Sequence, residues 1–528
     1  MFNSHFSVLD ASVSRTPSAP VFKTPVVDSS SGSITQWNTV TYEQFSRDIQ
    51  NSARYWASTL RAVPPRSVIG LWIGGFTYTD VLHIYGISRA GYVPQLFSLR
   101  LPNPSVIYEL LHRAQAKAII YDPNFASSLE SCPVPHFPAN DVIPASTYQI
   151  PTLPPVTESS VAFIFHTSGS TSGSPKLVPC TYRWLDSVVT KTRQTSKPIH
   201  GDKQDVTVWM GSMCHIGQSF MLIGSLQHGS CVIQPTKIAF SSDELIDMIQ
   251  RCGLNRLNQF AAFLAGHLRQ SRKDAKLLSI LCNLDEVLYS GLPLPRDEEE
   301  WAYSQGIRLK NLFGSTECGA MMLSVGGKDR HAPLLMPLKE MSYRFESVTP
   351  AEAGHQTNAR LMELVILSDS PDCPDTSLRH GDPHFHTGDL FQEVAPGMYA
   401  FRGRDDDWIK TETSLRCDTK AIEDNTRAMC GNLIAECVVV GTGRPSPVMF
   451  VEPVTDMDHD KLTKEIIRKT RQFHSRRYLH ERITSHKMIV VVPSGTLPRT
   501  VTKGNIRRKA VEEAFKDTLD SIHGVGSA

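Results

Sequence analysis

The sequence predicts an α/β protein built around a largely parallel sheet. Stretches in which apolar residues recur at helical spacing alternate with short apolar runs of strand length, which is typical of strand–helix units. With 528 residues, 41% of them apolar and 20% charged, the chain has globular composition and exceeds one ordinary core. One apolar run, residues 161–165, leads directly into a loop rich in Gly, Ser and Thr. We therefore expect two or more domains, with this loop at the end of a buried strand.

The first 121 residues begin with a polar segment and continue with alternating helix-like and strand-like segments. Residues 1–35 are rich in Ser, Thr and Pro, and we expect an extended lead-in there. Helix-like and strand-like segments alternate from Thr41 onward. The predicted helices are residues 42–60, 78–90 and 105–114, and the predicted strands are residues 67–73 and 118–121.

The second part begins with a Pro-rich segment, residues 133–155, which we predict to be a linker before the strand at residues 161–165. Further strands are predicted at residues 286–289 and 361–367, the latter nearer a sheet or barrel edge. The pattern changes after Asp405, where strands at 435–440 and 488–492 flank a helix. The apolar face of that helix consists of Leu462, Ile466, Thr470 and Phe473. This last part is predicted to form a separate small α+β domain.

Charge and cysteine content exclude several classes of protein. The net charge of +1 provides no field that would attract nucleic acid or an anionic membrane, so neither is expected as a partner. Eleven scattered cysteines without a Cys-x-x-Cys pair favour reduced thiols in a cytoplasmic protein. The N-terminus does not resemble a signal peptide, and apolar runs such as residues 488–492 are far shorter than a membrane span.

The Gly/Ser/Thr-rich loop has the chemistry of a phosphate-binding loop. Its residues are Thr167, Ser168, Gly169, Ser170, Thr171, Ser172, Gly173, Ser174, Pro175 and Lys176. Two glycines allow backbone turns that point successive N–H groups into one concavity, while hydroxyl groups and one lysine add donors. A flexible linker would not normally follow a buried strand. A Walker A loop is excluded because Lys176 stands three residues after Gly173 and is followed by Leu177.

This loop resembles the hallmark of the adenylate-forming superfamily, Thr-Ser-Gly-Ser/Thr-Thr-Gly-x-Pro-Lys-Gly, with Ser172 as an extra residue and Leu177 in place of the last glycine. The resemblance implies ATP-dependent activation of a carboxylic acid as its acyl-adenylate. It also implies a large N-terminal domain of packed α/β sheets with a small barrel-like subdomain (residues 1–404). A small mobile α+β C-terminal domain (residues 405–528) would follow.

A second motif, Asn-Leu-Phe-Gly-Ser-Thr-Glu at residues 311–317, is similar to the family's Tyr/Phe-Gly-x-Thr-Glu. The resemblance implies that Thr316 binds the α-phosphate and acts in catalysis. Glu317 would bind Mg²⁺, a cation that prefers oxygen ligands. The implied nucleotide-binding residues around them are Gly291, Asn311, Phe313, Gly314 and Ser315, with the Phe313 ring at the adenine.

A third and a fourth motif, His-Thr-Gly-Asp at 386–389 and Gly-Arg-Asp-Asp-Asp-Trp-Ile-Lys at 403–410, match the family in order and spacing. They imply that Asp389 and Arg404 bind the ribose, that Lys410 belongs to the nucleotide site and that Asp406 is the domain hinge. A metal site formed by Asp382, His384 and His386, beside His380, is the minority alternative, because Pro383 argues against a regular strand.

The C-terminal lysine of the family stands in Pro-x-Thr-x-x-Gly-Lys, whereas this chain has Pro-Arg-Thr-Val-Thr-Lys-Gly at residues 498–504. Lys503 is the candidate catalytic lysine and Lys509 the second choice, unless neither reaches the nucleotide. Residues 410–417 contain no glycine where the family places one beside the incoming thiol, which argues against a wide pantetheine tunnel. With only a short tail after Lys509, we expect a separate acceptor: CoA, a discrete phosphopantetheinyl carrier protein or an amine.

The acid is predicted from Trp-Met-Gly-Ser-Met-Cys-His at residues 209–215, which is closer to the His-containing segment of acyl- and aryl-acid ligases than to that of amino-acid-activating domains. No Asp is available there for an α-ammonium, whose unpaired burial would be costly, so an aryl or aliphatic acid is preferred. His215 is expected to gate the pocket, with a structural role as the alternative. Phe220, Phe260 and Phe263 either line the pocket or belong to the core. A nucleotide- or acyl-binding homologue with weak catalysis is the competing hypothesis.

Overall fold

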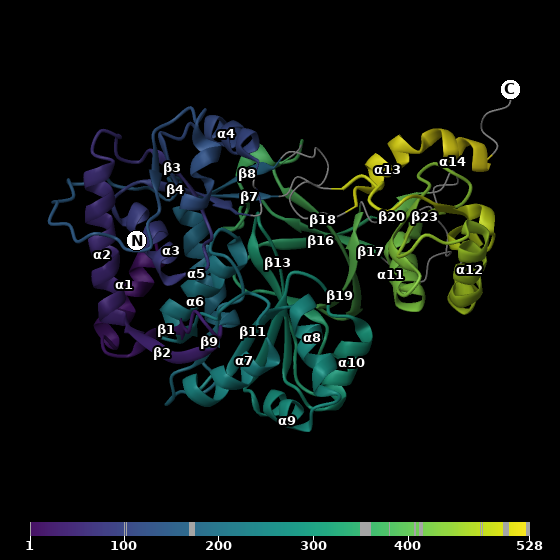
Figure 1. Ribbon diagram of the computed structural model, residues 1–528, viewed down its shortest axis with the longest axis horizontal. Coiled ribbons are helices and arrows are strands. Elements are labelled where there is room, and N and C mark those ends of the chain that lie inside the picture. Colours follow the sequence, from purple (N-terminus) through teal and green to yellow (C-terminus); the bar gives the residue numbers. More distant parts are fainter. Residues whose placement is uncertain are drawn as a thin grey trace.

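The computed structural model describes residues 2–523 apart from residues 100, 102, 168–174, 349–360, 380, 406–407, 411–415, 476, 478 and 500–505. For residues 410, 416 and 479 the backbone alone is described. Figure 1 shows a large N-terminal part and, at one end of the long axis, a smaller C-terminal part coloured from green to yellow. The candidate nucleotide-binding segments with described positions lie almost entirely in the larger part.

The predicted extended lead-in is wrong. Helix α1 (His5–Arg15) begins at Ser4, whose side chain accepts from the Ser7 N–H in a capping box. Strands β1 (Pro20–Val27) and β2 (Ile34–Thr41) follow and pair antiparallel. The prediction used the average composition of this segment, which does not reveal the short face of α1 formed by Val8, Leu9 and Ser12. That face is buried mainly against α6.

A six-stranded sheet carries the phosphate loop. Its strand order is β6 (His136–Pro138), β5 (Ala118–Tyr121), β3 (Val68–Ile73), β4 (Val93–Ser98), β7 (Val161–Thr167) and β8 (Lys176–Thr181). All neighbours are parallel except β7 and β8. The helices of this region are α2 (Tyr42–Thr59), α3 (Tyr78–Arg89) and α4 (Pro104–Arg113), with the 3₁₀ helix η1 (Pro123–Leu129). The helices and strands predicted before residue 133 match these bounds closely, and the Pro-rich segment forms only β6 and irregular chain.

A thirteen-stranded sheet makes up most of the rest of the N-terminal part, in the order β16-β17-β18-β19-β15-β14-β13-β12-β11-β9-β10-β1-β2. Its parallel strands are β9 (Val206–Val208), β10 (Cys231–Ile233), β11 (Arg256–Phe260), β12 (Glu286–Ser290) and β13 (Leu309–Ser315). Its antiparallel strands after β13 are β14 (Gly319–Ser324), β15 (Leu335–Pro337), β16 (Tyr343–Ser347), β17 (Leu361–Ile366), β18 (Phe385–Ala395) and β19 (Met398–Arg404). The parallel half continues into the antiparallel half through the turn between β13 and β14.

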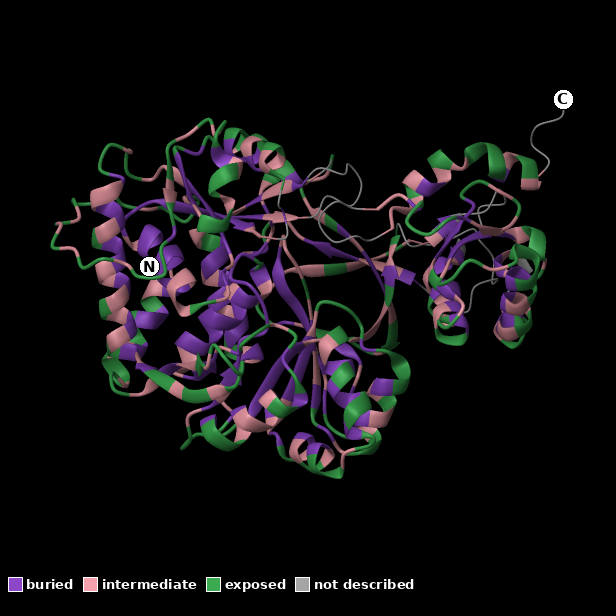
Figure 2. Cartoon of the chain, in the orientation of Figure 1, coloured by how far each residue is buried: buried purple, intermediate pink, exposed green. Residues whose placement is uncertain are grey.

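The helices of this second region are α5 (Tyr182–Thr195), α6 (Ile216–His228), α7 (Ser242–Asp247), α8 (Ala261–Ser271), α9 (Ala275–Asn283) and α10 (Arg296–Ser304). Two short helices complete it, the π-helix η2 (Met248–Cys252) and the 3₁₀ helix η3 (Thr376–Leu378). Helix α6 is largely buried, as Figure 2 shows, because it packs on α1, α5, β10 and β14. Helix α5, which packs on β7 and β8 as well as on β14, therefore connects the two sheets.

The C-terminal part has strands and clusters of its own. Strands β20 (Trp408–Lys410) and β21 (Arg416–Asp418) pair, and β22 (Ile434–Val440), β23 (Val448–Pro453) and β24 (Ile489–Val491) form a separate sheet. Its helices are α11 (Thr419–Cys430), α12 (His459–Ser475), α13 (Arg508–Ala514) and α14 (Lys516–His523), with the 3₁₀ turns η5 (Leu479–Glu481) and η6 (His486–Met488). The predicted face of α12 packs inward, with Leu462, Ile466 and Thr470 buried and Phe473 partly buried.

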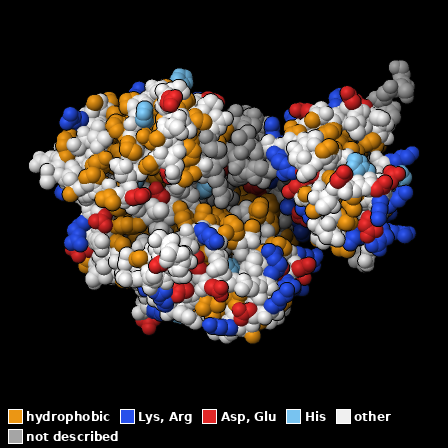
Figure 3. All heavy atoms as spheres, in the orientation of Figure 1, with side chains coloured by type: hydrophobic (Ala, Val, Ile, Leu, Met, Phe, Trp, Pro, Cys, Tyr) orange, Lys and Arg blue, Asp and Glu red, His pale blue; other side chains and the backbone are white. Residues whose placement is uncertain are grey.

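Surface and cysteine chemistry agree with a globular protein. All eleven cysteines are free thiols. No helix in the described part of the chain combines the length and apolar character that crossing a membrane requires. On the face in Figure 3, acidic and basic side chains are interspersed over both parts.

Candidate active site

The phosphate loop connects two antiparallel strands. Thr167 ends β7 and pairs with Lys176 at the start of β8. The loop residues between them, Ser168, Gly169, Ser170, Thr171, Ser172 and Gly173, lie outside the described residues. At the far end of the loop the Arg113 Nη1 atom donates to the Pro175 carbonyl over 3.2 Å. A strand–loop–strand connection differs from the strand–loop–helix of a Walker A site.

The base of the loop holds a neutral histidine that the sequence analysis missed. The His166 ring stacks on Phe97 with centroids 4.5 Å apart, and its Nδ1 lies 2.9 Å from the Leu96 carbonyl oxygen. Burial of the imidazole lowers its pKa to about 4. His166 therefore adds no positive charge beside the loop at neutral pH.

The turn at residues 315–319 carries Thr316 and Glu317. It joins β13 to β14, with Ser315 opposite Gly319, which adopts a left-handed φ of 68°. The Cys318 N–H donates to Ser315 Oγ over 3.2 Å. Thr316 and Glu317 are half-buried, and the Glu317 carboxylate forms no ion pair with any other described residue. An unpaired carboxylate in a tight turn is a suitable ligand for a hard cation.

Helix α5 holds this turn from behind. Trp184 Nε1 donates to the Glu317 carbonyl over 3.2 Å, and Lys191 Nζ donates to the Cys318 carbonyl over 2.8 Å. Neither Trp184 nor Lys191 was predicted as a site residue. One signal was available: Lys191 lies on the otherwise apolar stripe of α5, three residues after Val188.

The predicted adenine residues lie on the carboxyl ends of β12 and β13. Gly291 has a φ of 91°, and a Cβ there would stand 3.1 Å from the Phe260 ring. The Asn311 N–H donates to Ser324 Oγ over 2.8 Å. Gly314 is exposed, and a Cβ on it would stand 2.5 Å from the Gly319 carbonyl. This close approach of two backbones requires glycine at position 314.

The half-buried Phe313 ring packs inward as well. Its centroid lies 5.2 Å from that of Phe391 and 5.1 Å from that of Phe401. These aromatic contacts join β13 to β18 and β19, so Phe313 contributes to the core of the antiparallel half. Its predicted contact with adenine stays a prediction.

The predicted ribose residues Asp389 and Arg404 lie side by side. They face each other across β18 and β19, and Arg404 Nη1 donates to Asp389 Oδ1 over 3.0 Å. The Asp389 N–H donates to Thr387 Oγ1, and Gly388, with φ of 69°, donates its N–H to Glu363 Oε1 over 2.9 Å. These contacts fix the orientation of the Asp389 carboxylate. The side chain of Asp389 is almost fully buried.

The histidines upstream of Asp389 have protein partners. His384 Nδ1 accepts from the Ser368 N–H over 3.0 Å. His386 lies 3.0 Å from Glu363 Oε2 and 3.3 Å from Asp382 Oδ2, and these hydrogen bonds raise its pKa. His380 lies outside the described residues. Within the described part of the chain, no group of three His, Cys, Asp or Glu side chains is arranged to hold a metal ion.

His215, which is predicted to gate the acid pocket, is an exposed residue at the N-cap of α6. The segment before it is fixed to the end of β3, because Ser212 Oγ donates to the Gly74 carbonyl over 2.6 Å and the Met213 N–H to the Gly75 carbonyl over 2.6 Å. This arrangement orients the segment that contains His215 relative to the six-stranded sheet.

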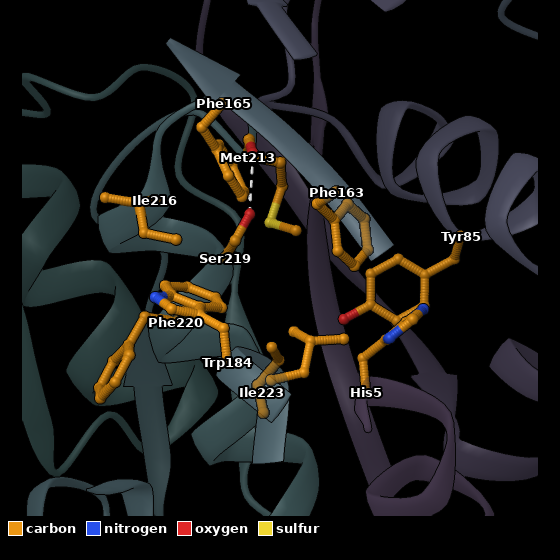
Figure 4. A pocket seen from close by; sticks show the side chains of 11 residues that line it. His5, Tyr85, Phe163, Phe165, Trp184, Met213, Ile216, Ser219, Phe220 and Ile223 are labelled. Atoms are coloured by element: carbon orange, nitrogen blue, oxygen red, sulfur yellow. Dashed lines mark hydrogen bonds between the residues drawn. The ribbon is translucent and has the colours of Figure 1, made fainter. Parts of the chain in front are cut away.

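A cavity of about 10 Å³ lies behind this segment (Figure 4). Its walls come from α1, α3, β7, α5 and α6, and the polar side chains among them include His5 and Ser219. Phe220 lines the cavity and is buried. Phe260 instead packs beside Gly211 and Gly291, and the ring centroid of Phe263 lies 6.5 Å from that of Phe260. None of the lining residues is an Asp or Glu.

The structure describes only some of the site residues predicted in the C-terminal part of the chain. Asp406 and Lys503 lie outside the described residues, and of Lys410 only the backbone, in β20, is described. Lys509 is exposed on α13. The two ends of the 500–505 segment lie together, because Arg499 and Ile506 form an antiparallel bridge and the Arg507 N–H donates to the Pro498 carbonyl over 2.8 Å.

That segment is anchored at each end to a buried glutamate. Arg499 Nη2 donates to Glu452 Oε2 over 2.6 Å, and Arg508 Nη1 donates to Glu423 Oε1 over 2.5 Å. Both carboxylates are more than 90% buried. Arg499 and Arg508, which flank the residues around Lys503, are therefore fixed to β23 and α11.

Comparison with known proteins identifies the family. Residues 9–341 match the model of the AMP-binding enzyme family, and residues 406–524 match that of the AMP-binding enzyme C-terminal domain. The chain is 36% identical over 519 residues to the AMP-binding domain-containing enzyme iboA of Amanita muscaria, covering 94% of this chain and 99% of iboA. It is 22% identical to the adenylate-forming reductase stbB of Stachybotrys bisbyi, covering 92% of this chain but 46% of the reductase.

The fold is that of known acyl-CoA synthetases. The o-succinylbenzoate CoA synthetase MenE of Bacillus subtilis, solved with the acyl-adenylate OSB-AMP, superimposes with a TM-score of 0.74 at 15% identity, covering 97% of this chain and 98% of MenE. The anthranilate CoA ligase AuaEII, solved with anthranoyl-AMP, gives a TM-score of 0.72 at 16% identity, covering 97% of each chain. The predicted fold class, a large N-terminal α/β domain with a smaller C-terminal domain, is confirmed. The chain belongs to the AMP-binding, adenylate-forming enzymes.

Proposed function

We propose that this enzyme uses ATP to convert a carboxylic acid into its acyl-adenylate, with release of pyrophosphate, and then transfers the acyl group to a thiol or an amine. The observation that supports this most strongly is the hydrogen bond from Trp184 to the Glu317 carbonyl. Trp184 follows Lys176 by eight residues, so this bond brings the chain just after the phosphate loop to the turn that carries Thr316 and Glu317. A triphosphate requires these two elements together.

The first step joins two anions. A carboxylate oxygen attacks the α-phosphorus, the acyl–oxygen–phosphorus linkage forms, and the bond to pyrophosphate breaks. The protein's task is to neutralise charge and to align the attack. Lys176 provides a cationic group and Thr316 a hydroxyl donor for the phosphates. Glu317 is suited to hold Mg²⁺, which when bound would offset phosphate charge.

The nucleoside is held from the other side. Asp389 accepts from Arg404 through one carboxylate oxygen, and a carboxylate has the acceptor chemistry that a ribose hydroxyl requires. Arg404 fixes the carboxylate orientation and compensates its charge. The predicted roles of Gly291, Asn311, Gly314 and Ser315 follow from their positions on the adjacent strand ends and in the turn.

The acid is proposed to be aryl or aliphatic and to lack an α-ammonium group. The absence of Asp and Glu from residues 209–215 supports this choice, because a buried ammonium without a carboxylate partner is strongly disfavoured. The acyl-adenylates in the structural neighbours MenE and AuaEII, OSB-AMP and anthranoyl-AMP, are of aryl acids. We propose CoA, a discrete phosphopantetheinyl carrier protein or an amine as the acceptor.

Acid-dependent exchange of pyrophosphate into ATP tests this function. The purified chain is assayed with Mg²⁺ and a panel of aryl, aliphatic, dicarboxylic and amino acids. We expect exchange with at least one aryl or aliphatic acid and none without acid. Exchange that is supported by amino acids but by no aryl or aliphatic acid of the panel would refute the proposed acid class. Measurable ATP binding without exchange for any acid would support a nucleotide-binding protein with weak catalysis.

The catalytic lysine is tested by a matched pair of variants. Lys503→Ala should slow exchange by about a hundredfold or more, because an electrostatic donor acting at the transition state is worth several kcal/mol. ATP affinity should change little. Lys509→Ala, on the exposed first turn of α13, should retain exchange. The reverse order of effects would assign the role to Lys509, and two unimpaired variants would exclude both.

A further inference from the structure

A fully buried lysine lies behind the turn that carries Glu317. Lys191 on α5 and Asp372, in the connection between β17 and β18, both have 0% of their side chains exposed, and Lys191 Nζ lies 2.5 Å from Asp372 Oδ2. Nothing in the family resemblance assigns a role to either residue. A buried ion pair of this kind needs an explanation, because removing two charges from water is costly.

The pair is fully hydrogen-bonded on the carboxylate side. Tyr343 donates its hydroxyl to Asp372 Oδ2, and Ser370 Oγ donates to Asp372 Oδ1 over 2.5 Å. Ser370 Oγ in turn accepts the Ser342 N–H over 3.0 Å. The network therefore joins β16 and the β17–β18 connection to α5.

The ammonium group also contacts the active-site turn. Lys191 Nζ donates to the Cys318 carbonyl over 2.8 Å, and Trp184 Nε1 donates to the Glu317 carbonyl over 3.2 Å. Residues 184 and 191 are seven positions apart, so they lie on one face of α5, two turns from each other. Two consecutive carbonyls of the turn thus accept hydrogen bonds from one helix.

We propose that Lys191 and Asp372 are positioning residues, which with Trp184 orient the 315–319 turn so that Glu317 and Thr316 meet the magnesium-bound triphosphate. The proposal rests on the proposed function only in taking the turn as a MgATP site. Once the carbonyls of Glu317 and Cys318 are fixed, the direction of the Glu317 side chain follows from the backbone.

The charges themselves support a role beyond packing. Apolar residues of similar volume usually stabilise a core as well as a buried ion pair does, or better. An apolar side chain at position 191, however, cannot donate to the Cys318 carbonyl. Asp372 lies in the connection that leads from β17 to β18, so the pair ties this connection to α5 and, through Lys191, to the 315–319 turn.

The test separates positioning from folding by replacing the whole network. In Lys191→Met/Asp372→Leu/Tyr343→Phe the buried charges and the tyrosine donor are removed together, so the fold should survive with an unfolding midpoint close to that of the wild type. Calorimetry without any acid then measures ATP affinity with and without Mg²⁺. We expect MgATP to bind at least tenfold more weakly, and ATP without Mg²⁺ to lose less affinity because only the contact to Thr316 is then affected. A folded triple variant with wild-type MgATP affinity would overturn the proposal.

A second pair of variants keeps the test valid if the triple variant does not fold. Trp184→Phe removes the donor to Glu317 together with part of the ring, and Trp72→Phe, which loses the same ring atoms, is its control. Trp72 is also fully buried, and its Nε1 has no partner among the described residues. MgATP affinity should fall several-fold in Trp184→Phe and not in Trp72→Phe, and equal affinities would contradict positioning. If the wild type binds MgATP but shows no acid-dependent exchange, the proposed function is refuted, and the comparison of MgATP affinities still tests this inference.

Discussion

The proposed magnesium side of the candidate site, at the 315–319 turn, and its proposed ribose side, at Asp389 and Arg404, are held in different ways. The 315–319 turn depends on α5, whose Trp184 and Lys191 precede it by more than 120 residues, and on the buried Asp372. The strands that carry Asp389 and Arg404 are neighbours in sequence, and their ion pair lies across one antiparallel register. The geometry of the turn therefore depends on distant residues, whereas that of the ribose pair is encoded locally.

The largest difference between the two sides should appear in stability. Lys191→Met leaves Asp372 as a buried charge without its partner, and such a change costs about 3–5 kcal/mol of unfolding free energy. Arg404→Met is the comparison on the ribose side, and it should cost less, because Arg404 is 44% exposed and water can replace part of its contact with the buried Asp389. Urea unfolding of both variants makes the comparison. Similar losses would show that the two sides are held alike.

The next effect concerns Glu317. Glu317→Gln retains the shape of the side chain and removes the charge that suits it to Mg²⁺. Exchange at limiting Mg²⁺ should fall about 10–100-fold, the range seen when even outer ligands of a metal are lost. Excess Mg²⁺ should restore part of the rate. Equal rates for variant and wild type at low Mg²⁺ would exclude Glu317 as a ligand.

Asp389→Asn sharpens the comparison on the ribose side. The amide presents one acceptor oxygen instead of two, so the KM for ATP should rise about tenfold, consistent with one hydrogen bond to a charged group. The Mg²⁺ dependence should not change, in contrast to Glu317→Gln. A changed Mg²⁺ dependence with an unchanged KM for ATP would reverse the assignment of the two sides.

The smallest effect is a pH dependence confined to the ribose side. Hydrogen bonds to Glu363 and then Asp382 raise the pKa of His386 above 6.5. Its charged form therefore stabilises the fold fully below pH 6.5, and the contribution is lost as the pH rises through the raised pKa. Because His386 is 39% exposed, the loss should be under about 1 kcal/mol. Unfolding free energies at pH 6 and pH 9 should differ more for wild type than for His386→Gln; identical differences would contradict this.

Much of the fold follows from local pattern. Apolar runs and helical spacing located β3, β5, β7, α3 and α12 to within a few residues, because each buries a face that the sequence displays. The first helix was missed, since its buried face is short and lies in a Ser-rich segment. A capping box at Ser4 was the available signal.

The site was predictable where a motif is contiguous. Thr316 and Glu317 share one turn, and Asp389 and Arg404 share one register, so the resemblance of short motifs to the family predicted them as neighbours. Lys191 and Asp372 stand 181 residues apart, and only the tertiary fold brings them together. A lysine on an apolar helix face indicates a buried partner, yet nothing in the sequence shows which carboxylate it is.

Direct detection of the intermediate tests the central claim. The enzyme is incubated at stoichiometric concentration with ATP, Mg²⁺ and the acid that gives the fastest exchange, without an acceptor, and the quenched products are analysed by mass spectrometry. The account predicts an acyl-adenylate bound by the wild type and strongly reduced in Glu317→Gln. ATP consumption that yields ADP, or bound ATP with no acyl-adenylate for an acid that supports exchange, would contradict it.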